Sequence, residues 1–170
     1  INTSDICLRT AIMEPLIRLA VKDDTPAIMG LIQGLADFEK EPDQVVITAD
    51  DLIRDGFGSD PKFWCFVAEV AHEIVGMALF YNRYSTWKGP TIHLEDLMVQ
   101  EEFRGRGVGT ALYRAVLSHA RARKVRRVNW EVLDWNTPAI DFYEKSGADV
   151  LKHWHVVSME DQAIESYLES

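Results

Sequence analysis

A short glycine-rich stretch, FRGRGVG (103–109), joins an apolar, strand-like run to a long helical pattern. The start of a helix leaves several N–H groups without intrahelical partners, and the summed peptide dipoles place partial positive charge there. We expect Gly105, Gly107 and Gly109 to adopt positive φ and to let the backbone approach a ligand closely. The two arginines of the stretch add formal charge and fork-shaped donors. The sequence therefore predicts a site for a phosphate or pyrophosphate at this junction.

The length and composition of the chain favour one folded domain. Its 170 residues, 47% of them hydrophobic, suffice for a core without disulfides or a metal. The first twelve residues show no clear period, so we interpret 1–12 as an N-terminal extension or a cloning remnant before a natural start at Met13, and 13–170 as the domain. Cys7 and Cys65 lie in unrelated segments without metal-ligand spacing, which argues against a disulfide or a zinc site.

Charge and hydropathy limit the partners of the chain. The formal net charge of −9 argues against a nucleic-acid partner and favours attraction of small cationic molecules. No apolar run approaches the ~20 residues of a membrane-spanning helix, and the N-terminus lacks the pattern of a signal peptide. We therefore expect no membrane partner and a cytoplasmic location.

Hydrophobic periodicity and turn residues divide the chain into helices and strands. Helical spacing, N-cap residues and glycine stops predict a short C-terminal helix and helices over 26–40, 49–58, 107–124 and 135–147. Strand-like runs cover 16–21, 63–70, 73–84, 91–99, 126–133 and 152–159. The middle strands predict an antiparallel meander, and strands alternate with helices after it. We expect a mixed α/β fold, with one twisted, mostly antiparallel sheet flanked by helices.

Two common phosphate-binding motifs do not fit the glycine-rich stretch. A Walker loop requires GxxxxGK[ST], and no such run occurs in the sequence. A dinucleotide-binding fold requires GxGxxG, but the sixth position counted from Gly105 is Thr110. A tight connection without a ligand is the other interpretation of the stretch.

Several blocks of sequence, in order, resemble one family. The run RGRGVG between LEDLMV and TALYRAVL resembles the (Q/R)xxGx(G/A) signature of the GNAT acetyltransferase superfamily. The blocks DLIRDGFG, YSTWKG, LEDLMV, LDWN and DFYEKSGA are similar to the spermidine/spermine acetyltransferase family, and YSTWKG with LDWN resembles its thialysine Nε-acetyltransferase branch. The resemblance implies a GNAT fold, a homodimer, and direct transfer of acetyl from acetyl-CoA to a primary amine of a small molecule, without a metal.

The resemblance also implies which residues bind acetyl-CoA. In that family the glycine turn wraps the pyrophosphate, and the backbone of the preceding strand pairs with the pantetheine arm and polarises the thioester carbonyl. A third segment lines the far side of the cofactor and can also cap a helix. The three groups correspond to Arg104, Gly105, Arg106, Gly107, Val108, Gly109 and Thr110; to Leu97, Met98 and Val99; and to Asn136, Thr137, Pro138 and Ala139.

The reaction requires two proton movements. A lysine-like amine has a pKa near ~10.4 and must lose its proton before it attacks the thioester. Glu95 matches the family's base, acting through water, with Asp96 alongside; strand alternation predicts that these neighbours face opposite sides of the sheet. Tyr143 matches the family's proton donor to the departing thiolate. If the resemblance is set aside, Glu95 and Asp96 can be explained as a solvated strand edge, and Tyr143 as a core residue.

The acceptor amine has its own set of matching residues. Phe38 and Glu39 match the family's substrate positions, with Glu39 as a charge partner, and Trp87 is expected to wall the cleft. Polyamine-preferring members carry an acidic residue two places before that tryptophan, whereas this chain has Ser85. The difference favours thialysine, lysine-like amino acids or short diamines over long polyamines such as spermine.

Two other functions stay open at this point. The fold also serves acetylation of protein lysines or N-termini, and a fold does not establish a function. A CoA-binding sensor without turnover is the second alternative. His153 and His155 would share one face of the strand predicted over 152–159, but they lack a third ligand at recognisable spacing, so we expect no metal site.

Overall fold

Two long neighbouring strands form the centre of the sheet in the computed structural model, which describes residues 14–170. They are β3 (Glu73–Ser85) and β4 (Gly89–Val99), joined by a short turn. On the β3 side the sheet continues with β2 (Trp64–Val70) and β1 (Leu16–Leu19), while β5 (Val128–Asn129) borders β4. Every pair is antiparallel except β4–β5, which is parallel. The expected mixed, mostly antiparallel sheet is confirmed.

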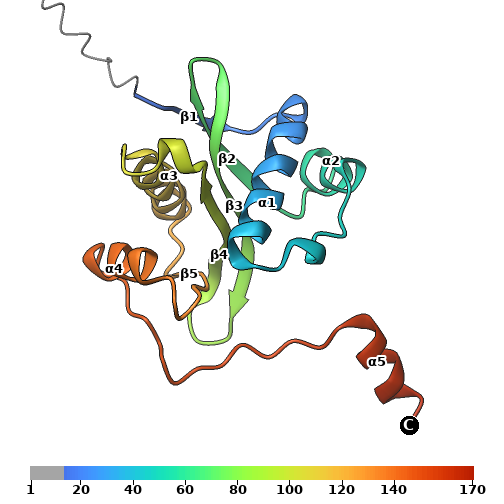
Figure 1. Cartoon of the computed structure of the whole chain (residues 1–170). Helices are drawn as coiled ribbons and strands as arrows, with labels where there is room; N and C mark the ends of the chain where they lie inside the picture. The colour runs from blue at the N-terminus through green and yellow to red at the C-terminus, as the bar shows by residue number, and fades with distance from the viewer. Residues whose placement is uncertain (1–13) are drawn as a thin grey trace, which may run out of the picture. The chain divides into compact units, whose positions relative to one another are not determined.

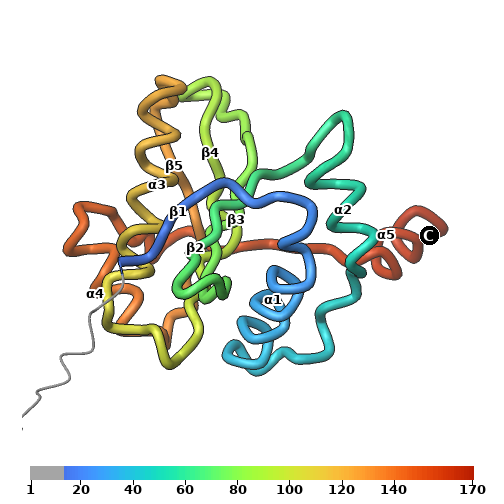
Figure 2. Tube along the Cα trace, turned by 90° about the horizontal axis from the view of Figure 1, so that it is seen from above, coloured from blue at the N-terminus to red at the C-terminus, as the bar shows by residue number. Residues whose placement is uncertain are grey.

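Helices cover both faces of this sheet (Figures 1 and 2). On one face α1 (Thr25–Glu39) and α2 (Ala49–Phe57) pack against the strands through the apolar cluster of Ile28, Leu31, Leu52, Cys65, Val67, Met77, Leu79 and Met98. On the other face lies α3 (Val108–Ala122), whose His119 ring contacts Phe66 and Phe80. The sheet therefore separates two cores, and the α1 side contains the candidate site residues of β4 described below.

Local sequence accounts for the ends of the helices. Pro26 lies in the first turn of α1, where its missing N–H removes no intrahelical bond. Thr48 caps α2: its hydroxyl accepts a bond from the Asp51 N–H at 3.2 Å, and the Asp51 carboxylate accepts one from the Thr48 N–H at 2.9 Å. This reciprocal capping box confirms the predicted start of α2.

A β-bulge interrupts the pairing of the two central strands. Leu79 of β3 pairs with Asp96, but the next residue, Phe80, pairs with Leu94. Glu95 is therefore the extra residue on β4.

The bulge decides which way two adjacent carboxylates face. Tyr81 and Leu79 share one face of β3, and their partners on β4 are His93 and Asp96. Glu95 follows His93 by two residues and so lies on that face as well. This is the α1 face, because Leu79 belongs to the cluster packed under α1. The expectation that Glu95 and Asp96 face opposite sides is wrong, because the bulge interrupts the alternation on which it rests.

The described chain divides into two compact units after Glu131. The second unit contains α4 (Thr137–Lys145) and α5 (Asp161–Leu168), with a long extended stretch between them (Figure 1). Residues 152–159, all of them described, form no strand, so that prediction is wrong, and the exposed His153 and His155 share no strand face. The strand expected over 126–133 is reduced to β5 because only two of its residues pair with β4.

The interpretation of residues 1–12 and the prediction for Cys7 lie outside the described residues. Cys65 is a buried free cysteine. Within residues 14–170, no three side chains of the metal-binding types come together. None of the helices in that range has both the length and the apolar character needed to cross a membrane.

Candidate active site

The glycine turn between β4 and α3 needs two of its three glycines for backbone conformation. Gly105 has φ of 70° and Gly107 has φ of 85°, in the left-handed region that side chains disfavour. Open space surrounds both positions where a Cβ would lie. Gly109 is different: it lies inside α3, and a Cβ there would meet Val99 at 3.7 Å without strain. The expectation of positive φ at Gly109 is therefore wrong.

The start of α3 has the properties of an anion site. Gly107 is its N-cap and has no side chain, so no side-chain acceptor occupies the first N–H groups of the helix. The chain reaches this point from β4 through the 3₁₀ turn η3 (Glu101–Phe103), and Arg104, which follows η3, has an extended backbone. The predicted phosphate position thus lies at the positive end of a helix dipole, where the N-cap provides no side-chain acceptor for the backbone N–H groups.

The two arginines of the turn make different contacts. Arg104 donates from Nε to the Val99 carbonyl at 2.9 Å and lies over the Phe38 ring, 5.3 Å from its centre. It therefore ties the turn to the end of β4 and to α1. Arg106 lies over the Phe103 ring at 5.5 Å and is exposed. Phe38, expected to contact the acceptor, is thus brought against a residue expected to contact the cofactor.

Burial and two neighbouring carboxylates set the pKa of Asp96, where α1 ends near the bulge. Burial, followed by the negative charges of Glu95 and Glu39, raises the pKa of Asp96 to about 6. Loss of hydration also raises the pKa of Glu39, the last residue of α1. An acid with a pKa near 6 is mostly ionised at neutral pH yet accepts a proton readily, which suits a general base.

An open polar pocket of about 290 Å³ lies on the same side of the sheet, lined by Tyr81, Arg83, His93, Glu95 and Glu131. Its central residue is the buried His93. One ring nitrogen of His93 lies 3.5 Å from Arg83 Nη1, and the other lies 3.5 Å from a Glu95 carboxylate oxygen. The Tyr81 ring packs at a tilt against the His93 ring, with 5.2 Å between the ring centres. Loss of hydration and the charge of Glu95 raise the pKa of Tyr81.

Only Glu95 among these pocket residues was expected from the sequence. Tyr81 and Arg83 are two residues apart on β3, and His93 and Glu95 are two apart on β4, so alternation places each pair on one face. That spacing is the signal by which the pocket could have been found. The fifth residue, Glu131, follows β5, and its nearness to β4 depends on the parallel pairing of those strands.

The turn between β3 and β4 is organised by Ser85. Its hydroxyl oxygen accepts bonds from the Trp87 and Lys88 N–H groups at 3.3 Å each, and from Arg127 Nη2 at 2.9 Å. Trp87 is 75% exposed and does not line the polar pocket. The serine therefore stabilises a turn and holds an arginine, and the expected role of Trp87 as a cleft wall stays a prediction.

The second unit contains the remaining predicted residues. The Asn136 side-chain oxygen accepts a bond from the Ala139 N–H at 3.3 Å and caps α4, with Pro138 in the first turn. The expected capping role of this segment is confirmed. Tyr143 is buried within α4, and its ring lies 5.3 Å from that of Phe142. Its expected role as proton donor stays a prediction.

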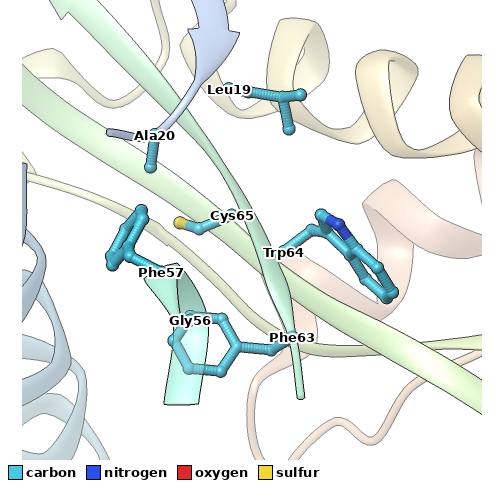
Figure 3. A pocket seen from close by; sticks show the side chains of 7 residues that line it. All are labelled: Leu19, Ala20, Gly56, Phe57, Phe63, Trp64 and Cys65. Atoms are coloured by element: carbon cyan, nitrogen blue, oxygen red, sulfur yellow. The ribbon is translucent and has the colours of Figure 1, made fainter. Parts of the chain in front are cut away.

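A second cavity, of about 80 Å³, is apolar. Figure 3 shows its lining of Leu19, Ala20, Gly56, Phe57, Phe63, Trp64 and Cys65. Burial raises the pKa of the Cys65 thiol to about 12, so this sulfur stays protonated and is a poor nucleophile. The cavity has no ionised lining group and offers no acid–base chemistry.

The fold, with a candidate anion site after β4 and carboxylates at the bulge, can be compared with known proteins. The chain belongs to the Acetyltransferase (GNAT) family, whose profile matches residues 18–148. It is therefore an N-acetyltransferase, and enzymes of this family use acetyl-CoA as cosubstrate.

Within this family, the chain is similar in sequence to acetyltransferases that are named for small amines. The chain is 39% identical over 160 residues to a thialysine N-epsilon-acetyltransferase of Bos taurus, covering 88% of this chain and 94% of that protein. It is 35% identical over 150 residues to a human spermidine/spermine N(1)-acetyltransferase-like protein 1, covering 82% of this chain but 22% of the relative. Among solved structures, an integron cassette protein from the mobile metagenome of V. cholerae matches 93% of this chain and 99% of its own, with a TM-score of 0.76 and 20% identity. At that identity the likeness shows the fold alone.

Proposed function

We propose that this enzyme acetylates the primary amine of a small cationic molecule: thialysine, a lysine-like amino acid, a diamine or a polyamine. The observation that carries the proposal is the open polar pocket containing Glu95, with Asp96 and Glu39 near the bulge. Carboxylates at this position attract a cationic amine and favour its approach. The relative from cattle, which is named for thialysine, supports the same substrate class.

The glycine turn is the proposed site of the cofactor pyrophosphate, formed by Arg104 to Thr110. Open space at Gly105 and Gly107 and the uncapped start of α3 fit a phosphate group held by backbone N–H donors. We assign the pantetheine arm to the backbone of Leu97, Met98 and Val99, and the far side of the cofactor to the segment Asn136 to Ala139. Bound acetyl-CoA supplies an acetyl group that is already activated as a thioester.

The protein's own residues handle the protons in this proposal. Glu95 and Asp96 accept the proton that the attacking ammonium must lose, directly or through water, since both face the α1 side of the sheet. The raised pKa of Asp96, about 6, makes it a stronger base than an ordinary carboxylate. Tyr143 donates a proton to the departing thiolate. A thiol titrates near ~8.5 and a tyrosine near ~10, so full transfer costs roughly 2 kcal/mol unless the site lowers it.

A thiol-release assay with a panel of acceptors tests the proposed function. The panel contains free thialysine, lysine, short diamines and spermine, together with a lysine-containing peptide and a peptide with a free N-terminus. We expect release of CoA with the free amines and an N-acetylated small product by mass spectrometry. Turnover with the peptides alone would establish protein acetylation instead, and cofactor binding without turnover would indicate a sensor.

Two further expectations belong with this proposal. The family resemblance suggests a homodimer, and the sequence suggests a cytoplasmic location. Light scattering after size-exclusion chromatography measures the oligomeric state directly, and a mass near the 19.4 kDa of one chain would contradict the dimer.

A further inference from the structure

The polar pocket has a distinctive combination of charges. Its lining contains one guanidinium, Arg83, and two carboxylates, Glu95 and Glu131, beside the neutral Tyr81. Neither Arg83 nor Glu131 forms an ion pair with another residue of the described chain, and both are exposed to solvent. Charged groups that converge on one pocket without pairing to each other are available to a ligand.

The length of the pocket can be judged from His93. Its two ring nitrogens contact Arg83 and Glu95 at 3.5 Å each. The guanidinium and the Glu95 carboxylate are therefore separated by roughly 9 Å at most, given the width of an imidazole ring built from ~1.3–1.5 Å bonds. An extended lysine-like chain spans a similar distance, roughly 7–8 Å, from its terminal nitrogen to its carboxylate carbon.

We propose that this pocket binds the α-amino acid head of a dibasic amino acid, with its carboxylate on Arg83 and its α-ammonium on Glu131, while its side-chain amine lies at Glu95. This inference rests on the proposed function, because it takes Glu95 as the position of the reacting amine. Arg83 and Glu131 are specificity-determining residues in this arrangement. His93, held between Arg83 and Glu95, forms the floor over which the aliphatic chain lies.

The sign of each charge distinguishes dibasic amino acids from other amines. A dibasic amino acid carries two ammonium groups and one carboxylate, which complement two carboxylates and one guanidinium. A diamine satisfies both carboxylates but leaves Arg83 without an anion. A long polyamine adds cations next to Arg83, where like charges repel. The pocket therefore favours thialysine, lysine and similar compounds over diamines and polyamines.

Three acceptors of nearly equal length separate these contributions. Lysine carries all three charged groups, cadaverine lacks the carboxylate, and 6-aminohexanoate lacks the α-ammonium. We expect the wild-type kcat/KM for lysine to exceed that for either analogue by about tenfold, the low end of the range for a charge-assisted contact because the groups are exposed. Mass spectrometry confirms that the acetyl group is on the side-chain nitrogen.

Two variants should shift the three acceptors in a crossed pattern. Arg83→Gln should lower kcat/KM about tenfold for lysine and 6-aminohexanoate and leave cadaverine unchanged or improved. Glu131→Gln should lower it for lysine and cadaverine and spare 6-aminohexanoate. Lys88→Gln is the matched control, because Lys88 is an exposed cation of the same hairpin outside the pocket lining. Lys88→Gln should leave kcat/KM for lysine, cadaverine and 6-aminohexanoate in the same proportions as in the wild type.

The outcomes separate this inference from the proposed function. A wild type that acetylates the three compounds equally, or an Arg83→Gln variant that loses lysine and cadaverine alike, overturns the inference and leaves the proposed function standing. A wild type that releases no CoA with any free amine contradicts the proposed function, and the inference with it. Circular dichroism and acetyl-CoA titration of each variant show whether a loss reflects unfolding.

Discussion

At the scale of single residues, Asp96 has the environment that matters most for pH dependence. Its pKa lies at about 6 instead of the ordinary 3.8 because of burial and the neighbouring Glu95 and Glu39. The folded protein therefore binds this proton more tightly than the unfolded chain does. The resulting stabilisation is present at low pH and is lost as the pH rises through about 6.

Replacing Asp96 by asparagine should stabilise the protein while impairing catalysis. At pH 7.5 Asp96→Asn removes a charge that the fold disfavours, so the free energy of unfolding should rise by about 1–3 kcal/mol, with a smaller gain at pH 5. Urea unfolding at the two pH values measures this difference. If Asp96 is a base, wild-type kcat/KM falls as the pH drops through about 6, and the variant lacks that inflection. A destabilised variant, or one that keeps the inflection, argues against this assignment.

Tyr143 offers a second test at the residue scale. The change Tyr143→Phe removes one hydroxyl and keeps the buried ring that packs within α4. If the hydroxyl donates a proton to the thiolate, kcat should fall about 10²–10⁴-fold while KM moves little. With an acetyl thioester whose leaving thiol is more acidic, steady-state kinetics should show a smaller fall in kcat for Tyr143→Phe. A more acidic thiol leaves as a thiolate without needing a proton from Tyr143. An equal loss with both thioesters would make Tyr143 a packing residue.

At the scale of elements, the turn into α3 tests the cofactor site. Gly107→Ala places a Cβ at φ of 85°, and Gly89→Ala does the same at φ of 77° in the β3–β4 turn, with open space at both positions. Each should cost about 1–2 kcal/mol of stability from the left-handed conformation. Only Gly107→Ala should also weaken acetyl-CoA binding, by about tenfold or more, because in the proposed cofactor site its Cβ would meet the phosphate. Calorimetric titration compares the two, and equal affinities would contradict the assignment of the turn.

The β3–β4 turn limits how simply polyamine specificity can be engineered. Ser85→Asp introduces an anion, but Arg127 Nη2 already donates to position 85, and the buried Arg127 Nε has no hydrogen-bond partner in the described structure. The new carboxylate should therefore pair with Arg127 and leave the ratio of kcat/KM for spermine and thialysine nearly unchanged. Combining Ser85→Asp with Arg127→Ala should shift that ratio several-fold towards spermine. If Ser85→Asp alone shifts the ratio of kcat/KM as much as the double variant does, Arg127 does not neutralise the new aspartate.

Particular elements show how far the sequence could predict this structure. The long strands, the helices and the capping box at Thr48 follow from alternation, helical spacing and cap residues, which are local properties. The bulge at Glu95 depends on register with β3, and the nearness of Glu131 depends on parallel pairing. The segment 152–159 alternates like a strand, but a strand requires a hydrogen-bonded neighbour, which its own sequence does not specify. Strand alternation in the sequence groups the pocket residues of β3 and of β4 into two pairs, whereas their meeting with Glu131, which follows β5, depends on how the strands pair.

At the scale of the whole molecule, the net charge of the protein should have opposite effects on the association of the amine and of acetyl-CoA. The chain carries −9, so its field attracts a cationic amine and repels the anionic acetyl-CoA. Raising the ionic strength from about 0.01 M to about 0.3 M shortens the Debye length from roughly 30 Å to less than roughly 10 Å. We expect kcat/KM for lysine to fall several-fold over this range, while kcat/KM for acetyl-CoA holds or rises. The zwitterion 6-aminohexanoate, with no net charge, serves as the matched acceptor and should respond weakly. If all three constants fall by one common factor, salt acts on the folded enzyme or its chemical step, and the overall field does not guide the amine.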